Sequence, residues 1–294
     1  MRVYKKIDAI KANIANLEST GKRIGFVPTM GALHSGHLKL VESSVANNHV
    51  TVVSIFVNPT QFNNPEDLKR YPRTIEKDIQ LLQNAGCDIL FLPEVEEMYP
   101  LGESLNHFDL SGLENMYEGR FRPGHFQGVC QIVDKLFQVV RPDQVYFGQK
   151  DYQQCMVIER LIALTPAFHS IQMNLAPTIR EENGLAMSSR NMRLSEAELQ
   201  QAPSLFQVLQ FIKEQIKPGA VQEVLQQATE MLMQKGFRPE YIAIANAKTL
   251  TEVAHWDGHK TIVVLVAAFL GEVRLIDNLI IYSEQAGASA EGMS

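Results

Sequence analysis

The chain has 294 residues, of which 45% are hydrophobic and 20% are charged, and its formal net charge is −6. This length predicts one large domain or two medium-sized domains. The sequence has no tract of Lys or Arg, which argues against bulk nucleic-acid binding, and no apolar run long enough to cross a bilayer.

The N-terminal segment and the cysteines indicate where the protein works. Residues 1–18 are charged and amphipathic, unlike a secretory signal peptide. The three cysteines, Cys87, Cys130 and Cys155, show no CxxC spacing and cannot all pair. They predict a reducing, cytoplasmic compartment in which buried thiols are the simplest role.

Up to about residue 178, short apolar runs alternate with amphipathic stretches of helical spacing. The expected strands cover residues 24–30, 50–58, 87–93, 144–149 and 170–179. The expected helices cover residues 37–48, 74–86, 125–140 and 151–164. Alternation of this kind predicts βαβ units, and runs that are apolar at nearly every position suit strands covered on both faces. We therefore expect an α/β fold with a Rossmann-like parallel sheet and helices on both of its faces.

After residue 180 the pattern changes to two helices followed by three β-rich runs. The helices are expected at 195–215 and 220–236, and the strands at 240–247, 261–271 and 273–282. This order predicts a smaller α+β domain at 179–284, which would act as a lid on a first domain at 1–178. Residues 285–294 are small and polar, and we expect them to be disordered.

The junction between the first expected strand and its helix carries His34-Ser35-Gly36-His37. The first turn of a helix offers unpaired N–H groups and a partial positive charge, and glycines at 31 and 36 let the backbone approach a ligand. Three interpretations are open. The two histidines are surface or capping residues, they bind a metal ion, or they act as cationic donors in a phosphate site for a nucleotide. No third metal-binding residue stands at a convincing spacing.

Polar residues also follow the next expected strand. Asn58 and Gln61 come directly after an almost wholly apolar run. In an open α/β sheet, ligands bind beyond the carboxyl ends of the strands, so these side chains are expected at the same crevice as the histidines. The alternative is that Asn58-Pro59 only makes a turn.

Two further segments carry groups that suit an anion. Lys150 and Asp151 open the helix after the fourth expected strand, with Gln154 on the same helix face; the alternative is an ordinary capping Asp beside a solvated Lys. Ser188, Ser189 and Arg190 stand in a loop at the expected domain boundary, where they suit phosphate oxygens or plain helix capping. Together the four segments present hydrogen-bonding groups to one side of one sheet.

Six motifs carry a resemblance to a known family. HSGH resembles the HxGH signature of the nucleotidyl-transferase and class I aminoacyl-tRNA synthetase superfamily, and MSSRN resembles its second signature. The ordered set resembles the pantothenate synthetase family; Gln149 is a mild departure, since Glu is frequent there. The motifs are PTMGALHSGH (28–37), VNPTQF (57–62), YPRT (71–74), RPGHFQGV (122–129), FGQKDYQQ (147–154) and REENGLAMSSRN (180–191).

The resemblance implies ATP-dependent condensation of (R)-pantoate with β-alanine to pantothenate, AMP and pyrophosphate, through an enzyme-bound pantoyl adenylate. It implies that Gln61 and Gln154 bind pantoate, that Gln61 also contacts β-alanine, and that His37 donates a proton. His34, Lys150 and Arg190 complete the implied catalytic set. The implied ATP site consists of Met30, Gly31, Ala32, Leu33, His34, Ser35, Gly36, His37, Gly148, Gln149, Lys150, Asp151, Ile179, Met187, Ser188, Ser189 and Arg190.

Mg²⁺ is expected to arrive on the ATP phosphates, because this hard cation prefers oxygen ligands and water, and Asp78 is a candidate outer contact. A homodimer is implied by the resemblance alone. Two other functions compete: an adenylyltransferase of the same superfamily, and a nucleotide-sensing module without catalysis. The neutral side chains of Gln61 and Gln154 favour a small hydroxy acid over the phosphorylated acceptor of an adenylyltransferase, and two intact signatures argue against a sensor.

Overall fold

The structure, a computed structural model, describes residues 1–282 of the chain. The predicted tail at 285–294 lies outside these residues. The chain divides into two compact units, one spanning Met1–Ile179 and one that begins at Arg180.

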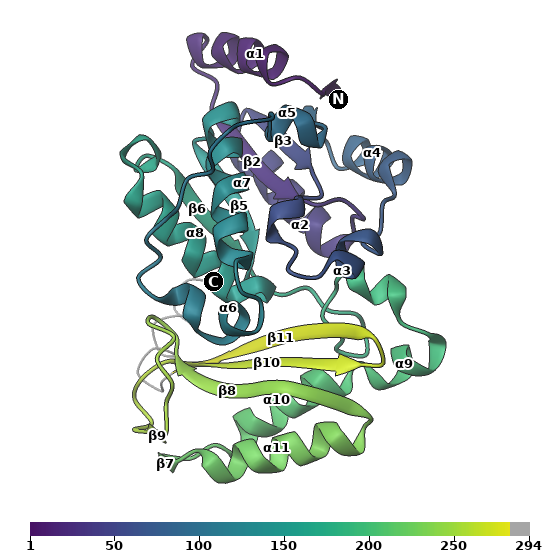
Figure 1. The fold of residues 1–294 in the computed structure, drawn as a ribbon, viewed down its shortest axis with the longest axis vertical. Helices are drawn as coiled ribbons and strands as arrows, with labels where there is room; N and C mark the ends of the chain where they lie inside the picture. The colour runs from purple at the N-terminus through teal and green to yellow at the C-terminus, as the bar shows by residue number, and fades with distance from the viewer. Residues whose placement is uncertain (283–294) are drawn as a thin grey trace. The chain divides into compact units, whose positions relative to one another are not determined.

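The first unit contains a parallel sheet (Figure 1). Its strand order is β1-β4-β3-β2-β5-β6, and every neighbouring pair runs parallel. The strands are β1 (Arg2–Tyr4), β2 (Ile24–Thr29), β3 (Val50–Ile55), β4 (Ile89–Phe91), β5 (Gln144–Gly148) and β6 (Gln172–Ala176).

Helices connect these strands. The α-helices are α1 (Ile7–Ser19), α2 (Ser35–Asn47), α3 (Pro65–Lys69), α4 (Ile75–Asn84), α5 (Val95–Met98), α6 (Tyr117–Phe121), α7 (His125–Val140) and α8 (Tyr152–Leu164). The 3-10 helices are η1 (Pro59–Gln61), η2 (Leu113–Asn115), η3 (Gln149–Asp151) and η4 (Pro166–Phe168).

Side chains that alternate along each strand fill two separate cores. Phe26 of β2 belongs to the core that α1, α7 and α8 cover, and its ring meets the Phe137 ring of α7 edge-on at 6.4 Å. Val27, the next residue, belongs to the other core, with Val41 of α2 and Leu82 of α4. Because successive strand residues point to opposite faces, a strand that is apolar throughout must be covered twice. The predicted parallel sheet with helices on both faces is confirmed.

The N-terminal strand β1 was not expected from the sequence. It pairs with β4 at the edge of the sheet, where Arg2 N donates to Asp88 O at 2.8 Å and Leu92 N donates to Tyr4 O at 2.8 Å. A segment of three residues followed by two lysines shows no periodicity that could reveal it. The strand forms because the edge of β4 offers its unpaired backbone groups.

The strand order defines where a ligand can bind. From β2, the chain runs to β3 and β4 on one side, and β5 and β6 lie on the other side. The order therefore reverses between β2 and β5. In open parallel sheets, the crevice beyond the carboxyl ends of the two strands at such a reversal is the usual ligand site. The loops after β2 and after β5 carry HSGH and GQKD.

The second unit is an α+β module. Three antiparallel strands in the order β11-β10-β8 pack against α10 and α11 around one apolar core, and a two-stranded pair, β7-β9, stands apart from this sheet. The strands are β7 (Gly219–Ala220), β8 (Phe237–Asn246), β9 (His255–Trp256), β10 (Ile262–Leu270) and β11 (Val273–Ile281). The helices are η5 (Ser189–Arg193), α9 (Glu196–Gln201), α10 (Ser204–Gln215) and α11 (Gln222–Gln234). The predicted α+β character is confirmed.

The prediction of a single helix over residues 195–215 is wrong. The chain forms α9, which ends at Gln201, and then α10, which begins at Ser204. Pro203 stands between them at the N-cap position of α10, without a side-chain capping bond. Proline lacks the N–H that a continuing helix needs, and its ring clashes with the preceding turn, so the apolar periodicity continues across a break in the helix.

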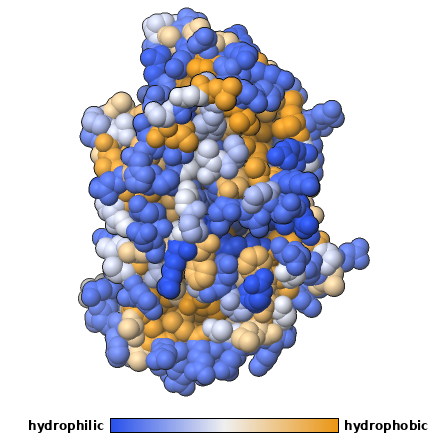
Figure 2. Space-filling view, in the orientation of Figure 1, coloured by the Kyte–Doolittle hydropathy of each residue, from blue (hydrophilic) through white to orange (hydrophobic). Residues whose placement is uncertain are grey.

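The face drawn in Figure 2 is mostly hydrophilic, with hydrophobic residues between the polar ones. Within residues 1–282, no helix has both the length and the apolar character that a membrane span requires.

Within the same residues, all three cysteines are free and buried. Burial raises the pKa of the Cys87 and Cys130 thiols to about 12 and also raises that of Cys155. The thiols are therefore protonated core side chains, as predicted, and unsuited to act as nucleophiles.

Candidate active site

The loop between β2 and α2 has an unusual backbone. Gly31 and Ala32 are both left-handed, with φ of 81° and 49°. The helix then begins at Ser35, and His34 caps it by accepting the Gly36 N–H at Nδ1, at 3.2 Å. A β-carbon at position 36 would lie 2.9 Å from the His34 ring, so the cap requires glycine there. The predicted position of His37, in the first turn of the helix, is confirmed.

Asp78 of α4 holds this loop in place. Its carboxylate is fully buried and accepts the N–H of Ala32 at 2.9 Å and that of Leu33 at 2.8 Å. The Thr74 hydroxyl donates to the same carboxylate at 3.1 Å. These bonds give Asp78 a structural role in the loop, and its role as an outer contact of a metal ion stays a prediction. No sequence signal marks the structural role, since 45 residues separate Leu33 from Asp78.

The rings of His34 and His37 stack at 4.1 Å, tilted by 39°. Burial, with a smaller contribution from the Lys150 charge, lowers the pKa of His34 to about 4. Burial, the neighbouring His34 and then Lys150 lower the pKa of His37 to about 3. These lowered pKa values favour neutral imidazoles in the protein without ligand, and the role of the two rings as donors to a phosphate stays a prediction. Both rings are neutral at pH 7 and contribute N–H donors beside a positively charged lysine.

These lowered values predict an acid-sensitive fold. Between pH 6.5 and about 4, an unfolded chain protonates both imidazoles while the folded chain does not, so the free energy of unfolding falls as pH falls. Each imidazole contributes at most about 1.4 kcal/mol per pH unit. We expect urea denaturation of the double variant His34→Gln/His37→Gln to lose less stability from pH 7 to pH 5 than the unsubstituted protein does. Equal losses would contradict the assignment of neutral rings.

The loop after β5 completes this side of the crevice. Gly148 ends β5, and Gln149, Lys150 and Asp151 form η3 directly before α8. Asp151 occupies the N-cap position of α8 without a side-chain capping bond, so the simple capping interpretation is wrong. The Lys150 ammonium lies 3.8 Å from the Asp151 carboxylate, and its charge acts on both histidines. The structure thus brings HSGH and Lys150 together at the reversal of strand order.

The polar residues after β3 meet the β2 loop. Gln61 is only 7% exposed, and its Oε1 accepts a hydrogen bond from Asn58 Nδ2 at 3.0 Å. Its Nε2 lies 3.3 Å from Met30 Sδ. Asn58 Nδ2 also donates to Gly128 O at 3.0 Å, and its Oδ1 accepts from the Tyr99 hydroxyl at 2.8 Å. Asn58 therefore does more than make a turn, because it orients the glutamine.

Gln154 and Ile179 are the remaining predicted residues of the first unit. Gln154 lies in the first turn of α8, half-buried, and within residues 1–282 no hydrogen bond joins it to Gln61. Ile179 ends the unit close to the histidine junction, since a β-carbon at Gly36 would lie 3.9 Å from its Cβ. Gln61 and Ile179 thus lie beside the β2–α2 junction, and Gln154 follows the Lys150 loop.

The loop with Met187 to Arg190 belongs to the second unit. Ser188 caps η5 by accepting the Arg190 N–H at 3.3 Å, so one of the two serines has the capping role considered as an alternative. Ser189 is buried. The loop starts from Arg180, whose guanidinium donates to both oxygens of Asp277, at 2.6 and 2.9 Å. The loop thus begins at a fixed ion pair and ends in a capped turn.

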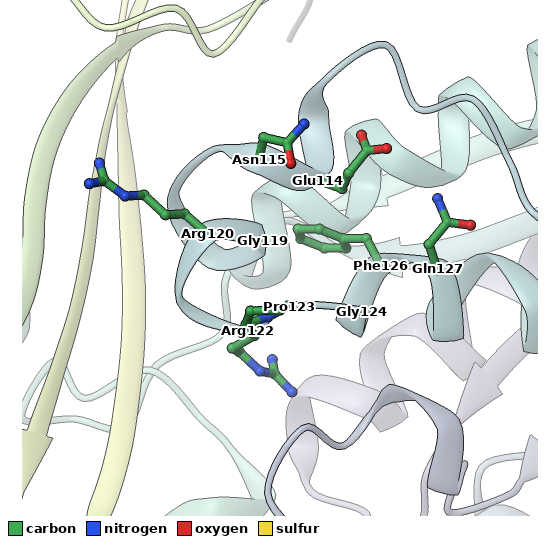
Figure 3. Close-up of a pocket in the computed structure, with 9 residues that line it drawn as sticks. All are labelled: Glu114, Asn115, Gly119, Arg120, Arg122, Pro123, Gly124, Phe126 and Gln127. Carbon is green, nitrogen blue, oxygen red and sulfur yellow. The ribbon is translucent and has the colours of Figure 1, made fainter.

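A cavity of about 310 Å³ lies beside α6 and the start of α7 (Figure 3). In this view the Phe126 ring lies amid the other lining residues, and the side chains of Arg120 and Arg122 point away from each other. None of its lining residues was predicted to bind ATP or pantoate. They are Glu114, Asn115, Gly119, Arg120, Arg122, Pro123, Gly124, Phe126 and Gln127.

Comparisons with known proteins agree with this geometry. A family model described as pantoate-beta-alanine ligase matches residues 2–280. The pantothenate synthetase of Bacteroides thetaiotaomicron is 44% identical over 280 residues, which cover 95% of this chain and 98% of the relative. The solved pantothenate synthetase of Thermus thermophilus matches with a TM-score of 0.87 at 42% identity, over 96% of this chain and all of the other.

A third comparison involves a structure with ligands. The pantoate-beta-alanine ligase of Francisella tularensis, solved in complex with beta-gamma ATP and β-alanine, matches with a TM-score of 0.81 at 34% identity. The match covers 95% of this chain and 97% of that one.

Proposed function

This chain belongs to the pantoate–β-alanine ligase family, and from that premise we propose that it joins (R)-pantoate to β-alanine in two ATP-dependent half-reactions. The observation that carries the proposal is the site at the strand reversal. There the N-terminus of α2, two imidazoles and Lys150 face the place where parallel sheets bind ligands. These are donors for phosphate oxygens.

In the first half-reaction, a pantoate carboxylate oxygen attacks the α-phosphorus of ATP. The bond from that phosphorus to the bridging oxygen breaks, and pyrophosphate leaves with the bonding electron pair. In the second half-reaction, the neutral amine of β-alanine attacks the carbonyl carbon of pantoyl adenylate and passes a proton to solvent. The bond from that carbon to the phosphate oxygen breaks, and AMP leaves with the bonding electron pair. The substrates supply both nucleophiles, so the protein needs no nucleophilic side chain.

The protein's contribution is to bind charge where it develops. Negative charge builds on the phosphate oxygens during the attack, and fixed N–H groups and cations there stabilise the transition state more than the ground state. We assign this role to His34, His37 and Lys150, with Arg190 from the second unit. Because both rings are neutral before ATP binds, His37 acts first as an N–H donor, and it takes a proton only when phosphate charge raises its pKa.

We assign the pantoate carboxylate and hydroxyls to Gln61 and Gln154, and β-alanine to Gln61. The support is that Gln61 is buried, neutral and held by Asn58 beside Met30 of the β2 loop. Mg²⁺ is proposed to enter with ATP. The support is chemical, because this hard cation prefers oxygen ligands and water, which the ATP phosphates provide.

Isotope exchange between ATP and pyrophosphate tests the proposal. Exchange that requires pantoate but not β-alanine is the expected result, because only the first half-reaction regenerates ATP from pyrophosphate. Exchange that is independent of pantoate would overturn the adenylate intermediate. Pantothenate formation without any exchange would point to a direct condensation.

Replacing Gln61 with alanine is expected to weaken pantoate binding by about ten- to hundred-fold. This factor corresponds to the loss of one hydrogen bond to a charged group. ATP affinity should change little, since the amide faces the acid. Calorimetric titration of each ligand measures the two effects. Asn64→Ala is the matched control, because Asn64 caps the neighbouring helix α3 through the Glu66 N–H and has no assigned ligand contact. Weaker ATP binding with unchanged pantoate binding would contradict the assignment.

We also propose a cytoplasmic location and a homodimer. The location is supported by three buried free thiols, which persist in a reducing compartment. The dimer is supported only by the family, and light scattering of the purified protein tests it directly.

A further inference from the structure

Four polar residues in the first unit are well covered, although the proposed chemistry does not use them. Gln153, Glu118 and His125 are 3%, 8% and 6% exposed, and the Arg122 side chain is 15% exposed. Buried polar groups persist when they have partners, and the partners of these four connect one element to the next.

The connection begins on α8, one residue before Gln154. Gln153 accepts the Glu118 N–H at 3.0 Å. Its amide nitrogen donates to Leu113 O at 2.7 Å and to Met116 O at 2.9 Å. One buried glutamine thus fastens the segment 113–118 to the first turn of α8, and so to the backbone that carries Gln154.

The next link is Arg122, which lies between Glu118 and His125. Its guanidinium is 3.7 Å from the Glu118 carboxylate and donates to His125 Nε2 at 3.1 Å. In Figure 3, the Arg122 side chain points away from that of Arg120, so the two guanidinium groups lie in different surroundings. The ion pair keeps Arg122 directed at the histidine.

His125 makes the last link, because its Nδ1 lies 2.8 Å from the backbone oxygen of Gln61. A carbonyl only accepts a hydrogen bond and a guanidinium only donates one. Nδ1 must therefore carry the proton and Nε2 must accept, which makes the ring neutral with a single allowed tautomer. A second proton would have to sit on Nε2, where the ring N–H and the guanidinium N–H of Arg122 would both be donors facing each other.

The helix of His125 approaches η1 very closely. A β-carbon at Gly128 would lie 2.4 Å from Thr60 O, and Gly128 O accepts from Asn58 at 3.0 Å. Helix α7 therefore holds Gln61 through two separate sets of hydrogen bonds. His125 fixes its main chain directly, and Asn58, which α7 anchors, fixes its side chain.

We propose that His125 is a positioning residue for the hydroxy-acid substrate, because its Nδ1–H holds the backbone of Gln61 and a buried chain of contacts links this bond to the helix of Gln154. The inference rests on the proposed function, in which these two glutamines hold pantoate. It predicts that loss of the Nδ1–H bond changes the pocket for the acid and leaves the ATP site intact.

Two substitutions separate the two bonds of the ring. In His125→Asn, the amide nitrogen takes the place of Nδ1 and can still donate to Gln61 O, but nothing reaches Arg122. In His125→Gln, the amide oxygen takes the place of Nε2 and can still accept from Arg122, but the donor to Gln61 is lost. We expect the pantoate KM to rise by about ten-fold in His125→Gln, with the ATP KM within about two-fold of the unsubstituted enzyme. His125→Asn should keep a pantoate KM within about three-fold of the unsubstituted value.

Asp134→Asn is the matched control. Asp134 is a buried polar residue of the same helix, 6% exposed, and it accepts from Gln138 at 2.8 Å. We expect its pantoate KM to be unchanged even where its melting temperature falls. Nitrogen-15 NMR of the imidazole in the unsubstituted protein provides a test that needs no variant: His125 should show a neutral ring with the proton on Nδ1.

The outcomes distinguish the inference from the proposed function. If the unsubstituted enzyme shows no pantoate-dependent exchange, the proposed function fails. If it does show exchange, the inference is overturned by either of two results: the pantoate and ATP KM values of His125→Gln rise by the same factor, or the NMR spectrum shows the proton on Nε2. A selective rise in the pantoate KM, rescued in His125→Asn, supports the inference even if both variants are less stable.

Discussion

Replacing His37 with alanine is expected to slow adenylate formation by about 10²–10³-fold in a protein that still folds, the usual effect of removing one donor to a developing oxyanion. His37 lies in the first turn of α2, stacked on His34 at 4.1 Å, and its Nδ1 is buried without a hydrogen-bond partner within residues 1–282. It fastens no other element, so its loss removes a donor from the site and little from the core. Pantoate-dependent exchange of pyrophosphate into ATP measures the step.

Two further variants sharpen the His37 experiment. His37→Gln places an amide donor near the position of Nε2 and should recover part of the lost rate. His107→Ala is the matched control, because His107 is an exposed histidine of the same unit, outside the predicted site. Near-normal exchange in a folded His37→Ala protein would remove this residue from the mechanism.

Replacing Asp78 with alanine should lower the free energy of unfolding by about 3–5 kcal/mol, because two buried N–H groups lose the carboxylate that accepts from them and a third bond is lost as well. The loop should also leave its left-handed conformation at Ala32, which costs energy without that support. ATP affinity is then expected to fall with stability. Urea denaturation and ATP titration measure the two effects.

Thr74→Ala is the matched control for Asp78→Ala. It removes the third bond, at 3.1 Å, and leaves both loop bonds in place, so we expect a loss of only about 1 kcal/mol and normal ATP binding. A loss below about 1 kcal/mol in Asp78→Ala itself would mean that the loop is held by other contacts.

The sequence predicted the elements that repeat a strong pattern. The strands β2 to β6 and four of the helices between them, α2, α4, α7 and α8, follow from apolar runs that alternate with stretches of helical spacing. The apolar character of these strands also predicts that both faces of the sheet are covered. The short helices α3, α5 and α6 were not predicted. Strand β1 could not be predicted, because its three residues form a strand only where β4 offers an edge. The break at Pro203 had a signal in the proline itself, which the apolar periodicity across 195–215 obscured.

For the site, the motifs predicted which residue types gather but not what holds them. HSGH and GQKD follow strands whose carboxyl ends meet, and that could be inferred from the alternation alone. The charge state of the histidines could not, because it depends on burial that only the packed structure creates. Asp78 and His125 act through contacts across 45 and 64 residues of sequence, and no local spacing reveals such pairs.

The pairing of β1 with β4 has a consequence for how the chain folds during synthesis. Arg2 leaves the ribosome well before its partner Ile89, which follows 87 residues later, so the outer edge of the sheet is among the contacts of largest sequence separation in this unit. Closing so long a loop is slow, and until it closes β4 presents an open edge to other chains. A fusion tag placed directly before Met1 would adjoin the strand that covers this edge, and the yield of monodisperse protein should depend on which end carries the tag.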